Sequence, residues 1–120
     1  MSIGTKPAAM TMLRLVVAVA AALLLARAAQ AEDLLAFKVV MKDGVITPDR
    51  IEVVLGTPFR IDVTNAGSAP AEFESDELHK EKVLVAGGTG SLFFRKISAG
   101  TYIFYDDFHP NGTKLTLIVK

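Results

Sequence analysis

The chain has 120 residues, a length that predicts a single domain, and its 13 Lys and Arg balance 13 Asp and Glu. It contains no cysteine and only two histidines, His79 and His109. Disulfide bonds are therefore excluded, and so is a type 1 copper centre, which needs a Cys thiolate beside two His ligands.

The N-terminal segment has the features of a secretory signal peptide. Two basic residues precede the apolar run Leu15–Leu25, and small residues follow at Ala29–Ala31. A membrane anchor is the alternative, but the run is shorter than the ~20 residues that span a bilayer. We expect a signal peptide over residues 1–31, export of the mature domain, and no stable membrane insertion after cleavage. The mature domain, residues 32–120, then has a net charge of about −3, which gives no indication of nucleic-acid binding.

Hydrophobic and polar residues alternate along most of the mature chain, in short runs separated by turn residues. This pattern predicts about eight strands and an all-β antiparallel sandwich or barrel. The segment Ser75–Lys80 lacks strand character, and we expect a helical turn there with Ser75 as its N-cap. The predicted strands cover residues 37–41, 51–55, 59–64, 71–74, 82–85, 92–97, 101–106 and 114–119.

The segment Glu72–Glu81 contains five carboxylates and His79 within ten residues. On a strand, Glu72 and Glu74 share one face while Phe73 points into the core. A solvated acidic loop is the simpler interpretation of such a charge run. Against this interpretation, five like charges packed together repel one another unless a cation or basic neighbours compensate for them.

A second candidate segment runs from Tyr102 to His109. Along a regular strand Asp106 and Asp107 point to opposite faces, and His109 follows three residues after Asp106. The alternative is that the two carboxylates cap a turn. Met41 is a third candidate, as a thioether ligand or, more simply, as a core residue.

Carboxylates with one or two imidazoles and no thiolate suit iron and manganese, and imidazole extends the range to copper or zinc. No nucleophile motif and no glycine-rich phosphate loop opening a helix is present in the sequence. We therefore expect no catalysis from the chain alone.

Several motifs, in order across nearly the whole mature chain, resemble the EfeO-type cupredoxin-like domains. Within this family they are most similar to the periplasmic cupredoxin-like component, the FtrB-like proteins, of bacterial ferrous-iron uptake systems. The matching segments are Gly44–Pro48, Asn65–Gly67, Glu72–Ser75, Glu77–Leu78, Glu81–Lys82, Gly100–Tyr102 and Phe104–Pro110.

The resemblance implies a cupredoxin-like Greek-key β-sandwich in the periplasm that binds an iron or copper ion for an inner-membrane iron permease and other periplasmic components. Any part in Fe(II) oxidation would require a partner protein or a second metal to take the electron, because a single mononuclear site has no obvious place to hold it. Relatives often carry two cysteines where this chain has Ile46 and, roughly, Asp106, which shifts the preference from copper toward iron. The candidate metal ligands are Glu74, Asp106, His109, Glu72, Asp107, His79 and Met41.

Two other functions remain open from the sequence. The acidic segment could be the recognition surface of an adaptor that docks a permease without binding metal. An enzyme acting alone, such as a cuproxidase, is disfavoured by the missing Cys and the scarcity of His.

Overall fold

A computed structural model describes residues 8–32 and 34–120. The chain divides into two compact units, with the boundary between Leu34 and Leu35. The first unit contains the helix α1 (Ala8–Glu32). Within the described residues, no helix is long and apolar enough to cross a membrane. The expected signal segment includes residues 1–7, which lie outside the described part of the chain.

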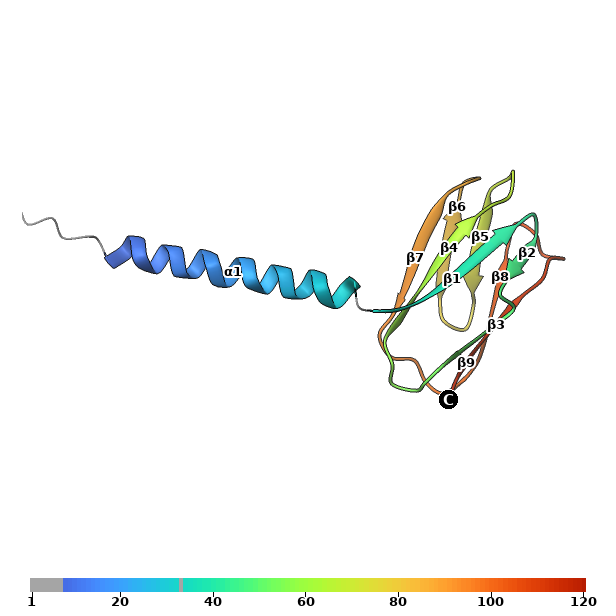
Figure 1. Ribbon diagram of the computed structural model, residues 1–120. Coiled ribbons are helices and arrows are strands. Elements are labelled where there is room, and N and C mark those ends of the chain that lie inside the picture. The colour runs from blue at the N-terminus through green and yellow to red at the C-terminus, as the bar shows by residue number, and fades with distance from the viewer. Residues whose placement is uncertain (1–7, 33) are drawn as a thin grey trace, which may run out of the picture. The chain divides into compact units, whose positions relative to one another are not determined.

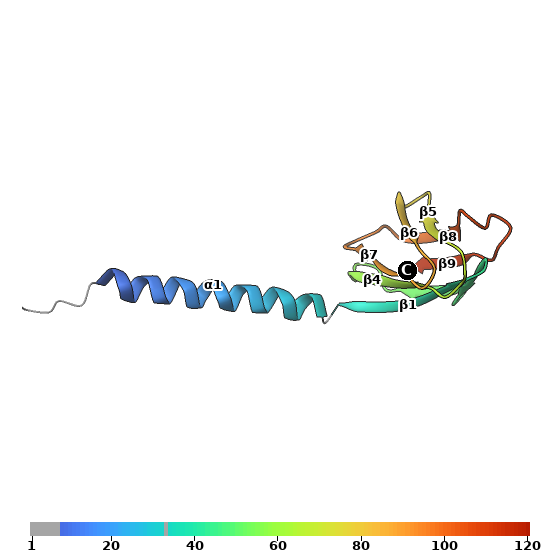
Figure 2. The same ribbon diagram turned by 90° about the horizontal axis from the view of Figure 1, so that it is seen from above.

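The second unit, Leu35–Lys120, is a sandwich of two β-sheets. One sheet has four strands in the order β2-β1-β4-β7, and the other has five in the order β3-β9-β8-β5-β6. Figure 1 labels the strands, and Figure 2 shows β1 and β4 in one layer with β5 and β8 in the other. The strands are β1 (Leu35–Lys42), β2 (Val45–Thr47), β3 (Arg50–Val53), β4 (Phe59–Asn65), β5 (Ala71–Ser75), β6 (Lys80–Leu84), β7 (Thr89–Phe94), β8 (Gly100–Asp106) and β9 (Leu115–Val119).

The all-β sandwich expected from the sequence is confirmed, with three differences. Strand β2 is additional, and it pairs antiparallel with β1. Two strand pairs, β1 with β4 and β3 with β9, are parallel, so the sandwich is not purely antiparallel. The expected helical turn after Ser75 is instead the loop of the β5–β6 hairpin, because Ser75 and Lys80 pair across the two strands.

Alternating residues of both sheets fill the core, as the period of two requires. Five phenylalanines form a connected series from one sheet to the other. Phe59 stacks on Phe94 at 4.7 Å and Phe104 stacks on Phe73 at 4.6 Å, both between ring centroids. Phe94 of the first sheet meets Phe104 of the second edge-on at 6.3 Å, and Phe37 meets Phe59 edge-on at 5.9 Å. These contacts give the two sheets one continuous core.

Two lysines of the edge strand β6 reach across to β7 of the opposite sheet. The Lys80 ammonium lies 5.5 Å from the centre of the Phe94 ring, a cation–π contact. Lys82 passes Gly90 so closely that a Cβ on this glycine would lie 2.8 Å from the Lys82 Cε atom. The lysine stems therefore bridge the two sheets along this side of the sandwich.

Candidate metal-binding site

Three carboxylates meet on the outer face of the five-stranded sheet. Glu72 and Glu74 lie two residues apart on β5, and Asp107 directly follows β8. The Asp107 N–H donates to the Glu72 carbonyl oxygen at 3.0 Å, which fixes the end of β8 against β5. One ligand atom from each of the three side chains lies within 4.8 Å of the other two. This spacing allows all three to approach a single cation.

Burial and mutual repulsion make it unfavourable to ionise the carboxyl groups of Glu72 and Glu74. Burial, followed by repulsion from Asp107 and Glu81, raises the pKa of Glu72. Burial, followed by repulsion from Glu72, Asp107 and Asp76, raises the pKa of Glu74. A bound cation would relieve this repulsion, because opposite charge favours the ionised form of each carboxyl group.

Tyr105 lies beside the carboxylate group, opposite Glu74 in the pairing of β5 with β8. Its hydroxyl donates to Asp76 Oδ1 at 2.8 Å, and this hydrogen bond is the main reason that the pKa of Tyr105 is raised. Tyr105 is not among the ligands expected from the sequence. The signal was present, since alternation along β8 places Tyr105 on the same face as Asp107.

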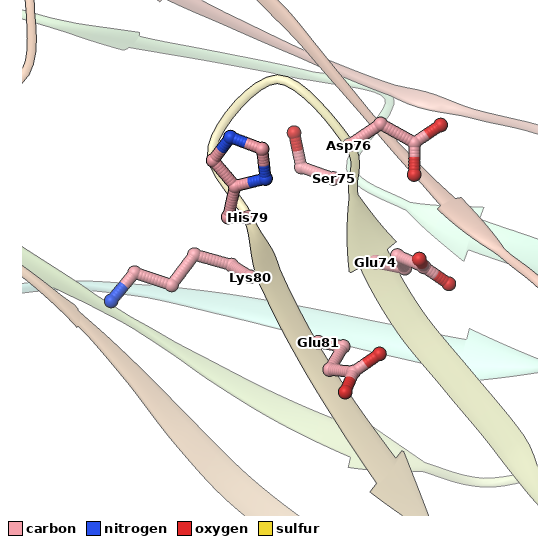
Figure 3. Close-up of a pocket in the computed structure, with 6 residues that line it drawn as sticks. All are labelled: Glu74, Ser75, Asp76, His79, Lys80 and Glu81. Atoms are coloured by element: carbon pink, nitrogen blue, oxygen red, sulfur yellow. The ribbon is translucent and has the colours of Figure 1, made fainter.

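The β5–β6 hairpin carries a shallow cleft next to the carboxylate group, shown in Figure 3. The carboxylates of Glu74, Asp76 and Glu81 point to one side of the hairpin. His79 stands at the loop, away from these carboxylates, and its backbone has a positive φ of 51°. Lys80 extends to the opposite side. His79 therefore lies outside the carboxylate group, although it shares the β5–β6 hairpin with Glu72 and Glu74.

Asp106 and His109 form a second, separate group. Asp106 pairs with Phe73 across the strands and faces the interior, whereas the neighbouring Glu74 faces outward. The structure thus groups Asp107, and not Asp106, with Glu72 and Glu74. His109 Nδ1 lies 2.7 Å from Asp106 Oδ2. The expected divergence of the two adjacent aspartates is confirmed, with Asp106 buried and Asp107 exposed.

Met41 lies in the hydrophobic core, 1% exposed, and pairs with Asn65 across β1 and β4. Its thioether is remote from solvent, as expected of a core residue. The Asn65 side chain is also buried, and its amide donates to the Ala69 and Leu84 carbonyl oxygens at 2.8 and 3.1 Å. Its Oδ1 accepts from the Gly67 N–H at 3.0 Å. These bonds give Asn65 a structural role, because they hold the β4–β5 loop to the end of β6.

The residues present do not fit a type 1 copper centre. The chain has no cysteine, and its two imidazoles lie in different groups, His79 on the β5–β6 loop and His109 beside Asp106. The three clustered carboxylates offer only hard oxygen donors, which suit iron, manganese and other hard cations. The fold and the carboxylate group together define a two-sheet β-sandwich domain with a site able to hold a cation.

Comparison with known proteins gives the family. A family of cupredoxin-like domains matches residues 15–119, and the chain belongs to it. An uncharacterized protein of Rickettsia prowazekii (strain Madrid E) is 30% identical over 89 residues, which cover 74% of this chain and 71% of that protein.

Solved structures share the fold at low sequence identity. The metal-binding domain of the Streptococcus pneumoniae D39 Cu(I)-exporting P-type ATPase CopA superposes with a TM-score of 0.62 and 16% identity, covering 71% of this chain and 84% of that one. Dithionite-reduced auracyanin from Roseiflexus castenholzii gives 0.60 and 14%, covering 71% and 96%. A copper-binding protein in its apo form gives 0.60 and 20%, covering 71% and 86%. These similarities confirm the expected cupredoxin-like fold.

Proposed function

We propose that this chain is an exported, periplasmic metal-binding protein that serves bacterial iron uptake. The observation that carries the proposal is the convergence of Glu72, Glu74 and Asp107 within 4.8 Å on a sandwich that has no thiolate. The cation is cargo, and these three carboxylates hold it. Oxygen donors suit hard cations, and the thiolates that select Cu(I) are absent from the sequence.

The role in iron uptake is supported by the similarity of the sequence motifs to the EfeO-type, FtrB-like domains. The proposed partners are an inner-membrane iron permease and other periplasmic components of the system. The apolar segment with small residues at Ala29–Ala31 supports export with cleavage after Ala31. Mass spectrometry of the protein recovered from the periplasm of a bacterial host tests this step, because an uncleaved N-terminus would contradict it.

Calorimetric titration tests the metal site. Protein purified after export is titrated with Fe²⁺ under anaerobic conditions and, separately, with Mn²⁺ and Cu²⁺. We expect saturable Fe²⁺ binding that is lost in the Glu72→Gln/Glu74→Gln double variant. Glu52→Gln is the control, since Glu52 pairs with Arg50 on β3 and with Lys120 just after β9, away from the site. Absence of saturable binding, or binding that the double variant retains, refutes the site.

Uptake of radiolabelled iron by cells that lack the protein tests the pathway and separates this function from that of an adaptor. Wild-type protein should restore uptake under iron limitation, and the double variant should not. Restoration by the double variant would instead identify the chain as an adaptor that needs no metal.

A further inference from the structure

Two loops that cross from one sheet to the other lie side by side at one end of the sandwich. Residues 54–58 join β3 to β4, and residues 95–99 join β7 to β8. In the four-stranded sheet the first residue of β4, Phe59, pairs with the last residue of β7, Phe94. In the other sheet the last residue of β3 and the first residue of β8 both pair with Val119. The two loops are therefore about 5 Å apart where they meet one sheet and about 10 Å apart where they meet the other.

We call the surface formed by residues 54–58 and 95–99 the base of the sandwich. Figure 1 shows both loops at the end that carries the C-terminus. Strand β1 also begins at this end, because its first residue, Leu35, pairs with the first residue of β4. The apolar N-terminal segment of the chain is thus joined to the sandwich at the base.

The first loop presents apolar side chains to solvent on an ordered backbone. The Leu55 N–H donates to the Lys120 carbonyl oxygen at 2.9 Å, and the Thr57 N–H donates to the Val54 carbonyl oxygen at 3.1 Å. Val54 is nevertheless 71% exposed and Leu55 54% exposed, and Leu35 adds a third exposed apolar side chain at this end. The base therefore exposes apolar surface that the fold itself does not cover.

The second loop presents two basic side chains. Ile97 packs against the core, and the Ser98 carbonyl oxygen accepts from the Tyr102 hydroxyl at 2.7 Å, so this loop is also anchored. Arg95 and Lys96 are exposed, and within the described part of the chain neither of them forms an ion pair. Their charges are available to an anionic partner.

The carboxylates near the base leave this positive charge in place. Glu52 of β3 is already paired with Arg50 and with Lys120. Glu32 and Asp33 precede β1 in the sequence, and β1 is separated from β7 by β4 in the order of the sheet. The loop after β7 is therefore the basic side of the base.

We propose that the base docks reversibly on a membrane surface that contains anionic lipids. Val54 and Leu55 enter the headgroup region, where apolar side chains leave water, and Arg95 and Lys96 bind the lipid phosphates. The contact needs no metal ion and no insertion of the chain across the bilayer. Asp107 follows the far end of β8, whose seven residues span roughly 20 Å, so the carboxylate group stays in the aqueous phase.

Sedimentation with vesicles tests the docking. Protein purified after export is mixed with vesicles of equal parts phosphatidylglycerol and phosphatidylcholine, or of phosphatidylcholine alone. We expect binding to the anionic vesicles that weakens with salt, and much weaker binding to the neutral ones. Arg95→Gln/Lys96→Gln should lower the affinity about 25-fold, since each basic residue at an anionic surface contributes about fivefold. Equal binding to the two kinds of vesicle, or no binding to either, overturns the proposal.

Lys42→Gln/Lys114→Gln is the matched control, because it removes the same charge at the opposite end, where β1 ends and β9 begins. It should change the affinity little, and a loss equal to that of Arg95→Gln/Lys96→Gln overturns the docking at the base. Circular dichroism verifies that each variant is folded.

The apolar contribution is tested with Val54→Ser/Leu55→Ser, which should also weaken binding. Its control is Val83→Ser/Val85→Ser, which changes two valines of similar exposure on β6 and in the loop after it. Wild-type affinity in Val54→Ser/Leu55→Ser overturns the proposal. Association of the protein with itself in the absence of vesicles, lost in this variant by sedimentation velocity, would identify a second copy as the partner and also overturns it.

NMR with spin-labelled phosphatidylglycerol in the vesicles locates the contact. The backbone amide signals of residues 54–57 and 95–98 should broaden more than those of residues 85–88, which join β6 to β7 at the opposite end. Stronger broadening at residues 85–88 overturns the proposal. Failure of Fe²⁺ binding would refute the proposed function alone, because the docking is measured without metal.

Discussion

Asp106→Ala removes the buried carboxylate that accepts from two backbone N–H groups, those of Glu72 and Phe108. A hydrogen bond to a charged group contributes about 1.5–3 kcal/mol, so the free energy of unfolding should fall by about 3–6 kcal/mol. His109 adds little to this loss, because its partly exposed ring can turn to water. Domains of this size have unfolding free energies of about 5–15 kcal/mol, so this loss is a substantial part of the total stability.

Urea denaturation followed by far-ultraviolet circular dichroism, with a chelator present, measures the loss. Asp106→Asn should lose less than Asp106→Ala, since its amide oxygen still accepts from both backbone groups. Asp107→Ala is the control for removing an exposed carboxylate, and it should change stability little. The slope of free energy against urea should stay the same in all three. A loss below about 1 kcal/mol in Asp106→Ala, or one equal to that of Asp107→Ala, would show that the hydrogen bonds to Asp106 do not contribute measurably to the free energy of unfolding.

Three further predictions concern the site and its surroundings. The pKa of Glu72 is raised, so the folded chain binds more protons at this carboxyl group than the unfolded chain does, and the stability that Glu72 contributes is lost as pH rises from about 4 toward neutrality. The slope of melting temperature against pH should therefore be more positive in Glu72→Gln than in the wild type. An unchanged slope in Glu72→Gln would contradict this assignment. Because Asp76 raises the pKa of Tyr105, Asp76→Asn should lower the pH at which this phenol ionises in an ultraviolet titration, and an unaltered titration would count against the hydrogen bond. In Gly112→Ala the new Cβ would collide with the Gly44 carbonyl oxygen, so we expect a loss of about 1–3 kcal/mol in urea denaturation and shifted His109 signals. Wild-type stability in this variant would exclude the tight contact.

Alternation along the chain was sufficient to predict most of the sandwich. Phe73 is buried between Glu72 and Glu74, and Phe104 is buried on the face that it shares with Asp106, as the period of two requires. The same period predicted that Asp106 and Asp107 would diverge. These are local properties of single strands, which is why one sequence is enough to find them.

Pairing between distant segments could not be predicted in this way. Strand β2 is only three residues long, and its Ile46 N–H donates to the Thr113 hydroxyl 67 residues later, at 2.8 Å. The parallel partners β1 and β4 carry no sequence signal that distinguishes them from antiparallel ones. The choice between Asp106 and Asp107 depends on the Glu72 backbone, whose N–H binds one aspartate and whose carbonyl oxygen binds the N–H of the other. Such contacts become visible only when β5 and β8 lie side by side.

The lysines that lean from β6 toward β7 also affect how copies of this protein meet one another. An edge strand offers unpaired backbone groups to which a strand from another molecule can add, and charged side chains directed inward at an edge oppose such growth. Lys80 and Lys82 place two ammonium groups at an edge of the five-stranded sheet. An arriving strand would have to bury these charges beside Phe94 and Gly90. The lysines on β6 thus also oppose edge-to-edge pairing between copies of the protein at high concentration.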